Sequence, residues 1–151
     1  MAPLELKSPV FADGEQIPDK YGYTAANVNP PLEIEDVPAE AEALALVMDD
    51  PDAVEPAGKV WDHWVVWNLD PETTTIPEGW DASGAVQGQN DYGEQAYGGP
   101  NPPDAEHTYR FRLYALAQQL ELDANATKAD LETAMSGNVL EETTLEGTYA
   151  P

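Results

Sequence analysis

Apolar and polar residues alternate along several short stretches of the chain, and this two-residue period is typical of β-strands. Residues 42–48 (EALALVM) alternate and are cut to strand length by the turn that follows. Residues 63–69 (HWVVWNL) are apolar, aromatic and β-branched, which predicts a buried strand. Residues 108–117 (TYRFRLYALA) also alternate strongly. We further expect an edge strand at 4–8 (LELKS) and one or two final strands at 139–149.

The best candidate for a regular helix is the segment 127–135. Thr127 can cap the amide three residues on, Asp130 can answer it in a capping box, and Gly137 is placed to end the helix. The residues expected to face the core are Leu131, Ala134 and Met135. Residues 70–100, in contrast, carry many glycines and several prolines. They predict a long, turn-built loop of the kind that often faces a ligand.

Strands separated by turns and joined by one clear helix predict a mainly β fold, an antiparallel β-sandwich with a minor α-helical part. A chain of 151 residues with 42% hydrophobic content fits a single domain spanning residues 1–151. Four tryptophans and seven tyrosines supply large faces for a core, which argues against disorder.

The charge is strongly acidic, with 29 Asp and Glu against 6 Lys and Arg and a formal net charge of −23. The acids are spread from Glu5 to Glu146 and do not form a tail. This pattern favours a protein from a halophile, kept soluble in concentrated salt that screens the repulsion. A nucleic-acid mimic is the alternative. A nucleic-acid binder is excluded, because the chain has too few cations to neutralise a row of phosphates.

The chain has no cysteine, which excludes a disulfide framework and thiolate chemistry. The first residues, MAPLELKSPVF, hold no apolar run of signal-peptide length. No stretch approaches the roughly 20 apolar residues of a membrane span. We therefore expect a soluble protein of the cytoplasm.

The chain has two histidines, and each stands near the start of a strand-like run. Strict alternation would point the side chains of one set in a single direction, namely Trp61, His63, Val65 and Trp67. On the later strand it would place one set of side chains on one face, namely His107, Tyr109, Phe111 and Leu113. The opposite face would then carry Arg110, Arg112 and Tyr114. Each histidine then sits at the mouth of an apolar face, which is how a ligand pocket is built.

The turn MDDPDA at 48–53 is able to present a carboxylate at a strand end. Two imidazoles and an aspartate can bind an anion, bind a metal ion or act as an acid–base pair. Alternatively, each histidine is an ordinary hydrogen-bonded residue of the fold, and the tryptophans belong to the core. Spacing along the chain leaves these alternatives open, because it does not show that residues 50, 63 and 107 meet.

Taken together, several ordered motifs resemble the phosphatidylethanolamine-binding protein family, in its bacterial and archaeal, Raf-kinase-inhibitor-like branch. The matching segments cover nearly the whole chain and are SPVFADGEQIP, NPPLEIEDVP, DDPDA, WDHWVVWNL, QNDYG, YGGPNPP, TYRFRLYAL and LETAMSGNVLEETTLEGTY. The resemblance implies a β-sandwich with Greek-key connections and a small anion pocket at one end.

Carried over residue by residue, the resemblance also implies a ligand site. The residues implied to form it are Asp50, His63, His107, Tyr109, Gly99, Pro100 and Trp61, with Asp52 in a structural role. The prolines of residues 98–103 would hold a loop rigidly over the pocket, and its glycines would let backbone N–H groups approach an anion. No cofactor and no metal ion are implied.

The chain departs from the family pattern around this pocket. Asn101 stands where the family often has cysteine, Val54 where it often has proline, and Thr108 where a basic residue is usual. Asp104 and Glu106 lie where a glycine is usual before the second histidine. We expect these two acids to repel a bound anion from about 8 Å and so to tune its affinity.

These features predict a non-enzymatic binding protein for a small phosphate-bearing or carboxylate ligand. One alternative is a regulator that inhibits a kinase or serine protease. Another is a hydrolase or metal-dependent enzyme that uses the histidine pair, although the chain offers no obvious nucleophile. Expected partners are a small anion or, in the regulatory alternative, a protein, and a homodimer is left open. Nucleic acid and stable membrane association are not expected, because anionic surfaces repel so acidic a chain.

Overall fold

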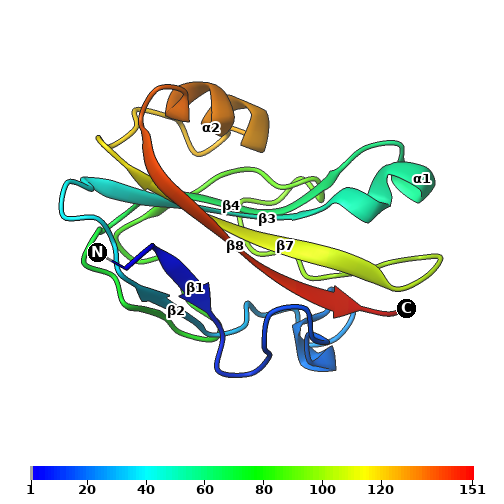
Figure 1. Cartoon of the computed structure of the whole chain (residues 1–151). Coiled ribbons are helices and arrows are strands. Elements are labelled where there is room, and N and C mark those ends of the chain that lie inside the picture. Colours follow the sequence, from blue (N-terminus) through cyan, green and yellow to red (C-terminus); the bar gives the residue numbers. More distant parts are fainter. Residues whose placement is uncertain (1) are drawn as a thin grey trace.

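Two antiparallel β-sheets face each other in the computed structural model, which describes residues 2–151 (Figure 1). The smaller sheet has the strand order β1-β2-β5, formed by Glu5–Lys7, Leu32–Glu35 and Thr75–Ile76. The larger sheet has the order β6-β4-β3-β7-β8, formed by Val86–Gln87, Trp61–Leu69, Ala43–Asp50, His107–Leu116 and Val139–Tyr149. The helices are two 3₁₀ turns at Asp19–Tyr21 and Pro51–Ala53, α1 at Val54–Ala57 and α2 at Lys128–Met135.

The main core fills the space between the two sheets. Leu6 of β1, Leu32 of β2 and Ile76 of β5 pack in one buried cluster with side chains of the larger sheet. Those side chains come from alternate positions of β3 and β7, including Leu44, Leu46, Met48, Phe111 and Leu113. The sequence-based prediction of a mainly β, sandwich-like fold with few helices is therefore confirmed.

A second apolar layer lies on the other face of the larger sheet, under α2 (Figure 1). Leu131 and Met135 of α2 pack in this cluster against side chains of the sheet, which include Ala45, Val47, Val65 and Trp67. The helix begins as predicted, because Thr127 accepts from the Asp130 amide and Asp130 accepts from the Thr127 amide. Because both faces of β3 are covered, this strand is buried along its whole length.

The side-chain directions predicted for residues 61–67 are wrong, and a β-bulge is the reason. Met48 pairs with Trp64 and Asp49 with Asp62, so one step along β3 spans two steps along β4 at His63. An extra residue resets the two-residue alternation. Val65 and Trp67 therefore pack under α2, whereas the His63 ring lies against Tyr109 on the face toward the other sheet.

The loop predicted at 70–100 contains two short strands that sequence reasoning missed. Thr75–Ile76 pairs with β2, and Val86–Gln87 pairs with β4. Each has two residues, too few to show a period in the sequence. The expected edge strand near the N-terminus is β1, and residues 139–149 form the single strand β8. Within residues 2–151, no helix has the length and apolar content needed to cross a bilayer.

A fully buried carboxylate, Asp49, joins α2 to the larger sheet. It accepts from Arg110 Nε at 2.8 Å, from Arg112 at 3.2 Å and from Lys128 of α2 at 3.2 Å. Lys128 also lies 2.9 Å from Asp62. Burial raises the pKa of Asp49, but the bonds from Arg110 and Lys128 outweigh it, and the pKa is lowered overall. Half of the six cations of the chain thus gather on one carboxylate.

The remaining cations form exposed pairs, so most carboxylates have no lysine or arginine partner within residues 2–151. Lys7 pairs with Glu5 and Glu35, Lys20 with Glu78, and Lys59 with Asp91. Repulsion among the other acids acts over roughly 10 Å at 0.1 M salt and over roughly 3 Å at 1 M.

We expect the melting temperature to rise when KCl is increased from about 0.1 M to about 1 M, because the added salt screens this repulsion. Differential scanning calorimetry measures the shift. Sucrose at matched osmolality is the control, since it does not screen charge. A melting temperature that stays level, or that rises equally in sucrose, contradicts the proposed halophilic adaptation.

Candidate functional site

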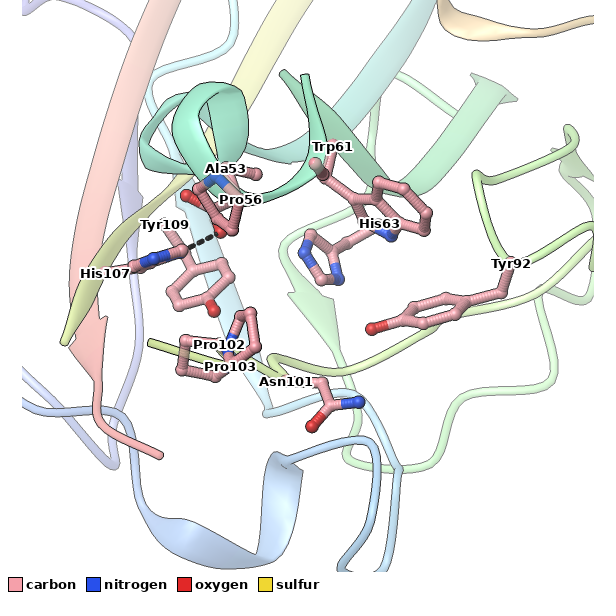
Figure 2. Close-up of a pocket in the computed structure, with 12 residues that line it drawn as sticks. Ala53, Pro56, Trp61, His63, Tyr92, Asn101, Pro102, Pro103, His107 and Tyr109 are labelled. Atoms are coloured by element: carbon pink, nitrogen blue, oxygen red, sulfur yellow. Dashed lines mark hydrogen bonds and ion pairs between the residues drawn. The ribbon is translucent and has the colours of Figure 1, made fainter. Parts of the chain in front are cut away.

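A cavity of about 190 Å³ opens where the ends of β3, β4 and β7 meet the loop that precedes β7 (Figure 2). Its lining residues are Asp50, Ala53, Pro56, Ala57, Trp61, His63, Tyr92, Asn101, Pro102, Pro103, His107 and Tyr109. Three segments that lie far apart in the sequence are thus brought together, and with them both histidines and Asp50.

The turn after β3 positions Asp50. Its side chain accepts from the Asp52 amide at 2.9 Å and so caps the 3₁₀ turn that Pro51 begins. Asp52 in turn accepts from the Thr108 amide at 2.9 Å. These two bonds fix the turn against the first residues of β7, with His107 next to Asp50.

His107 is a buried imidazole held between two carboxylates. Nδ1 lies 2.6 Å from Asp50 Oδ2, and Nε2 lies 2.8 Å from Asp104 Oδ1. Burial lowers the pKa of His107, but the two carboxylates outweigh it and raise the pKa overall. The hydrogen bond from His107 lowers the pKa of Asp104. A carboxylate acceptor at each ring nitrogen thus favours the protonated form of His107, in which both N–H groups are bonded.

His63 is a neutral imidazole in a fixed orientation. Its Nδ1 donates to the Gly98 carbonyl at 2.8 Å, and burial lowers its pKa to about 4. The ring lies edge-on to Tyr109, with ring centroids 5.2 Å apart, and edge-on to Tyr92 at 5.7 Å. The pKa values of the two histidines are thus shifted in opposite directions.

Two buried donors of the cavity wall have no hydrogen-bond partner within residues 2–151, the Tyr109 hydroxyl and the Trp61 indole N–H. Burial raises the pKa of Tyr109 far above its usual range, and the charge of Asp50 adds to this, so the hydroxyl keeps its proton. Figure 2 shows Tyr109, His63 and Tyr92 arranged around one open space. An acceptor atom entering that space would satisfy the hydroxyl.

Gly99 and Pro100 are not among the residues that line the cavity. The expectation that Gly99 offers its N–H to an anion is wrong, because this N–H donates to Asn27 Oδ1 at 2.8 Å. A glycine is required there for packing, since a Cβ atom would come within 2.1 Å of the Tyr21 carbonyl oxygen. Asn101, Pro102 and Pro103 form the wall instead.

Sequence reasoning missed Tyr92 and the residues of the turn after β3. Tyr92 donates to the Gly99 carbonyl at 3.0 Å and stacks on Tyr23, with ring centroids 3.9 Å apart. The QNDYG turn that contains Tyr92 contributed to the family resemblance, but the resemblance did not identify this tyrosine as a site residue. Ala53, Pro56 and Ala57 have no polar group to mark them. Within residues 2–151, no cluster of three or more histidine, aspartate or glutamate side chains is arranged to hold a metal ion.

Because the chain has two histidines, NMR can follow each of them. We expect one imidazole Cε1 proton to titrate above the usual histidine pKa, from His107, and the other at about 4, from His63. Asp104→Asn removes one carboxylate and is expected to lower the pKa of His107. Glu106→Gln, an exposed neighbour, is the control and should leave it unchanged. Two midpoints near the usual value contradict this electrostatic assignment.

Comparisons with known proteins agree over almost the whole chain. The family model for phosphatidylethanolamine-binding protein matches residues 7–150. A UPF0098 protein of Methanothermobacter thermautotrophicus is 45% identical over 151 residues, covering 97% of this chain and 98% of its own length. A UPF0098 protein of Chlamydia pneumoniae is 42% identical over 148 residues, covering 97% and 98%.

Solved structures give the same result. A crystal structure described as a phosphatidylethanolamine-binding protein homolog from Chlamydia trachomatis matches with a TM-score of 0.91 and 41% identity, covering 97% of each chain. YbcL of E. coli, described as a member of the mammalian family, matches with a TM-score of 0.90 and 29% identity, covering 98% of each chain. Sequence and fold therefore lead to one conclusion: the chain belongs to the phosphatidylethanolamine-binding protein family.

Proposed function

We propose that the cavity binds a small phosphate- or carboxylate-bearing ligand beside Asp50, His63, His107 and Tyr109. The observation that carries the proposal is the Tyr109 hydroxyl, which is fully buried and has no partner within residues 2–151. A buried polar group without a partner costs roughly 1–3 kcal/mol. A ligand oxygen that accepts from this hydroxyl recovers that free energy.

The walls of the cavity support a ligand of this kind. Ala53, Pro56, Pro102 and Pro103 are apolar, so the few polar groups act where little water competes with them. At about 190 Å³ the space suits one compact acidic group. It is smaller than the roughly 300–1,000 Å³ of sites for drug-sized molecules.

Asp104 affects ligand binding in a different way from the repulsion that its position in the sequence predicts. Its carboxylate bonds His107 Nε2 directly at 2.8 Å, where repulsion over a distance was expected. The side chain is about half exposed, at 47%, so it is free to turn into solvent. A ligand oxygen that bonds this nitrogen replaces Asp104, which therefore acts as a competitor for the site.

Titration calorimetry with inorganic phosphate and with acetate tests the proposal. We expect Tyr109→Phe to weaken binding roughly tenfold, because the ligand loses one hydrogen bond in a dry site. Tyr114→Phe is the matched control, since Tyr114 packs under α2 on the opposite face of the sheet. The absence of binding by both anions contradicts the proposal, as does equal affinity of the parent and Tyr109→Phe.

A further inference from the structure

We infer that the cavity takes its ligand in a protonated form, as an acid group that still carries one O–H. This inference rests on the proposed function and names the chemical form of the ligand. The ligand O–H donates to Nε2 of His63, while another ligand oxygen accepts from the hydroxyl of Tyr109. A phosphate monoester carrying a single negative charge has both features on one phosphorus atom.

The hydrogen bonds of His63 fix its tautomer. A carbonyl oxygen can only accept, so the nitrogen that bonds the Gly98 carbonyl at 2.8 Å must carry the hydrogen. The Gly98 amide in turn donates to the His63 carbonyl at 2.9 Å. Two reciprocal bonds between the same pair of residues thus hold the ring in one orientation. In the neutral ring, Nε2 is then the unprotonated nitrogen and a hydrogen-bond acceptor.

The acceptor nitrogen of His63 faces the cavity. His63 lines the cavity, and Figure 2 shows its ring directed into the space shared with Tyr109. No protein group within residues 2–151 bonds Nε2, whereas Nδ1 is fully engaged. The ring centroids of His63 and Tyr109 are 5.2 Å apart, so one small group is able to touch both side chains. The wall therefore offers an acceptor beside a donor.

The charges around the His63 ring also favour a ligand with a single negative charge. The charged and titratable groups nearest His63 are Asp49 and Asp50 from β3, Asp91 and Tyr92 from the loop, and His107 and Tyr109 from β7. Asp49 and Asp91 are already paired with lysine or arginine, so Asp50, which bonds His107, is the carboxylate that lines the cavity. A doubly charged phosphate is repelled by Asp50 in the cavity wall and has no hydrogen to give Nε2. The singly charged form meets less repulsion and has that hydrogen.

Methyl phosphate and dimethyl phosphate separate the effect of the ligand's charge from that of its P–O–H group. At about pH 5 each carries close to one negative charge, because the second pKa of a monoester is about 6. Only methyl phosphate has a P–O–H. We expect it to bind roughly tenfold more tightly by calorimetry, since dimethyl phosphate leaves Nε2 unpaired. In His63→Leu the side chain has no acceptor for the P–O–H, so the preference is expected to disappear. A preference that survives in His63→Leu reflects the bulk of the second methyl group and overturns the inference.

Proton uptake on the parent protein gives a second measurement that needs no variant. At about pH 7.5 methyl phosphate is mostly doubly charged, so binding the protonated form must take up close to one proton. Calorimetry in two buffers of different ionisation enthalpy measures this number. Binding of methyl phosphate without proton uptake overturns the inference. Tight binding of dimethyl phosphate accompanied by proton uptake also overturns it, because the proton then resides on His63 and not on the ligand. If neither ester binds at any pH, the proposed function itself fails.

Discussion

Asp49→Asn is expected to lower the free energy of unfolding by about 3 kcal/mol, the scale of a broken buried ion pair. Asp49 is fully buried and bonds cations from β7 and α2. Asparagine keeps the shape but not the charge, so Arg110, Arg112 and Lys128 are left beside an amide. For a domain of this size the loss corresponds to a fall of about 10 °C in melting temperature.

Urea denaturation in about 1 M KCl measures this loss, with Asp123→Asn as the matched control because Asp123 is exposed. Salt screens exposed charges far more than buried pairs. The loss in Asp49→Asn should therefore persist at high salt, where removal of a surface acid has almost no effect. A change below about 1 kcal/mol would show that Asp49 does not hold α2 to the sheet.

His63→Ala and His107→Ala are each expected to weaken phosphate binding roughly 30-fold, the loss of one hydrogen bond that involves a charged group. Both side chains line one cavity of about 190 Å³ and contact the Tyr109 ring at centroid distances of 5.2 and 6.3 Å. Because both act on one ligand, the double variant should lose less than the product of the two single losses. Calorimetry on the four proteins gives the coupling.

The His107 variant needs a control for folding. His107 is the partner of the buried Asp50 carboxylate at 2.6 Å, so alanine leaves that carboxylate unpaired. Glutamine can donate to Asp50 through its amide, and His107→Gln should fold more stably than His107→Ala while still lacking the cation. Losses that multiply in full, or no loss from either histidine, would mean that the two side chains serve separate structural roles.

The sequence predicts the faces of β7 correctly and those of β4 incorrectly, for one physical reason. Tyr109, Phe111 and Leu113 all reach the core between the sheets, because β7 pairs with β3 without a break. The bulge at His63 is a property of the pairing between two strands and leaves no mark in the local pattern. The helix start at Thr127, in contrast, depends on residues three apart and was predictable.

The site was predictable where the family resemblance implied which residues, distant in the sequence, lie together in the fold. Spacing along the chain does not show that Asp50, His63 and His107 meet. The ordered motifs, through the family resemblance, implied that they share one site. The contact between Asp104 and His107 was missed because it depends on how the proline-rich loop turns before β7. Composition likewise gave the shortage of cations but not their gathering on Asp49, since that requires α2 to lie over β3.

A crystal structure of the protein grown with methyl phosphate tests the central claim most directly. We expect density for the phosphate group between His63 and Tyr109, within hydrogen-bond distance of both, with the Asp104 carboxylate turned away from His107 Nε2. Phosphate bound elsewhere on the surface, or an empty cavity at a ligand concentration well above the measured dissociation constant, would contradict the assignment of this cavity as the ligand site.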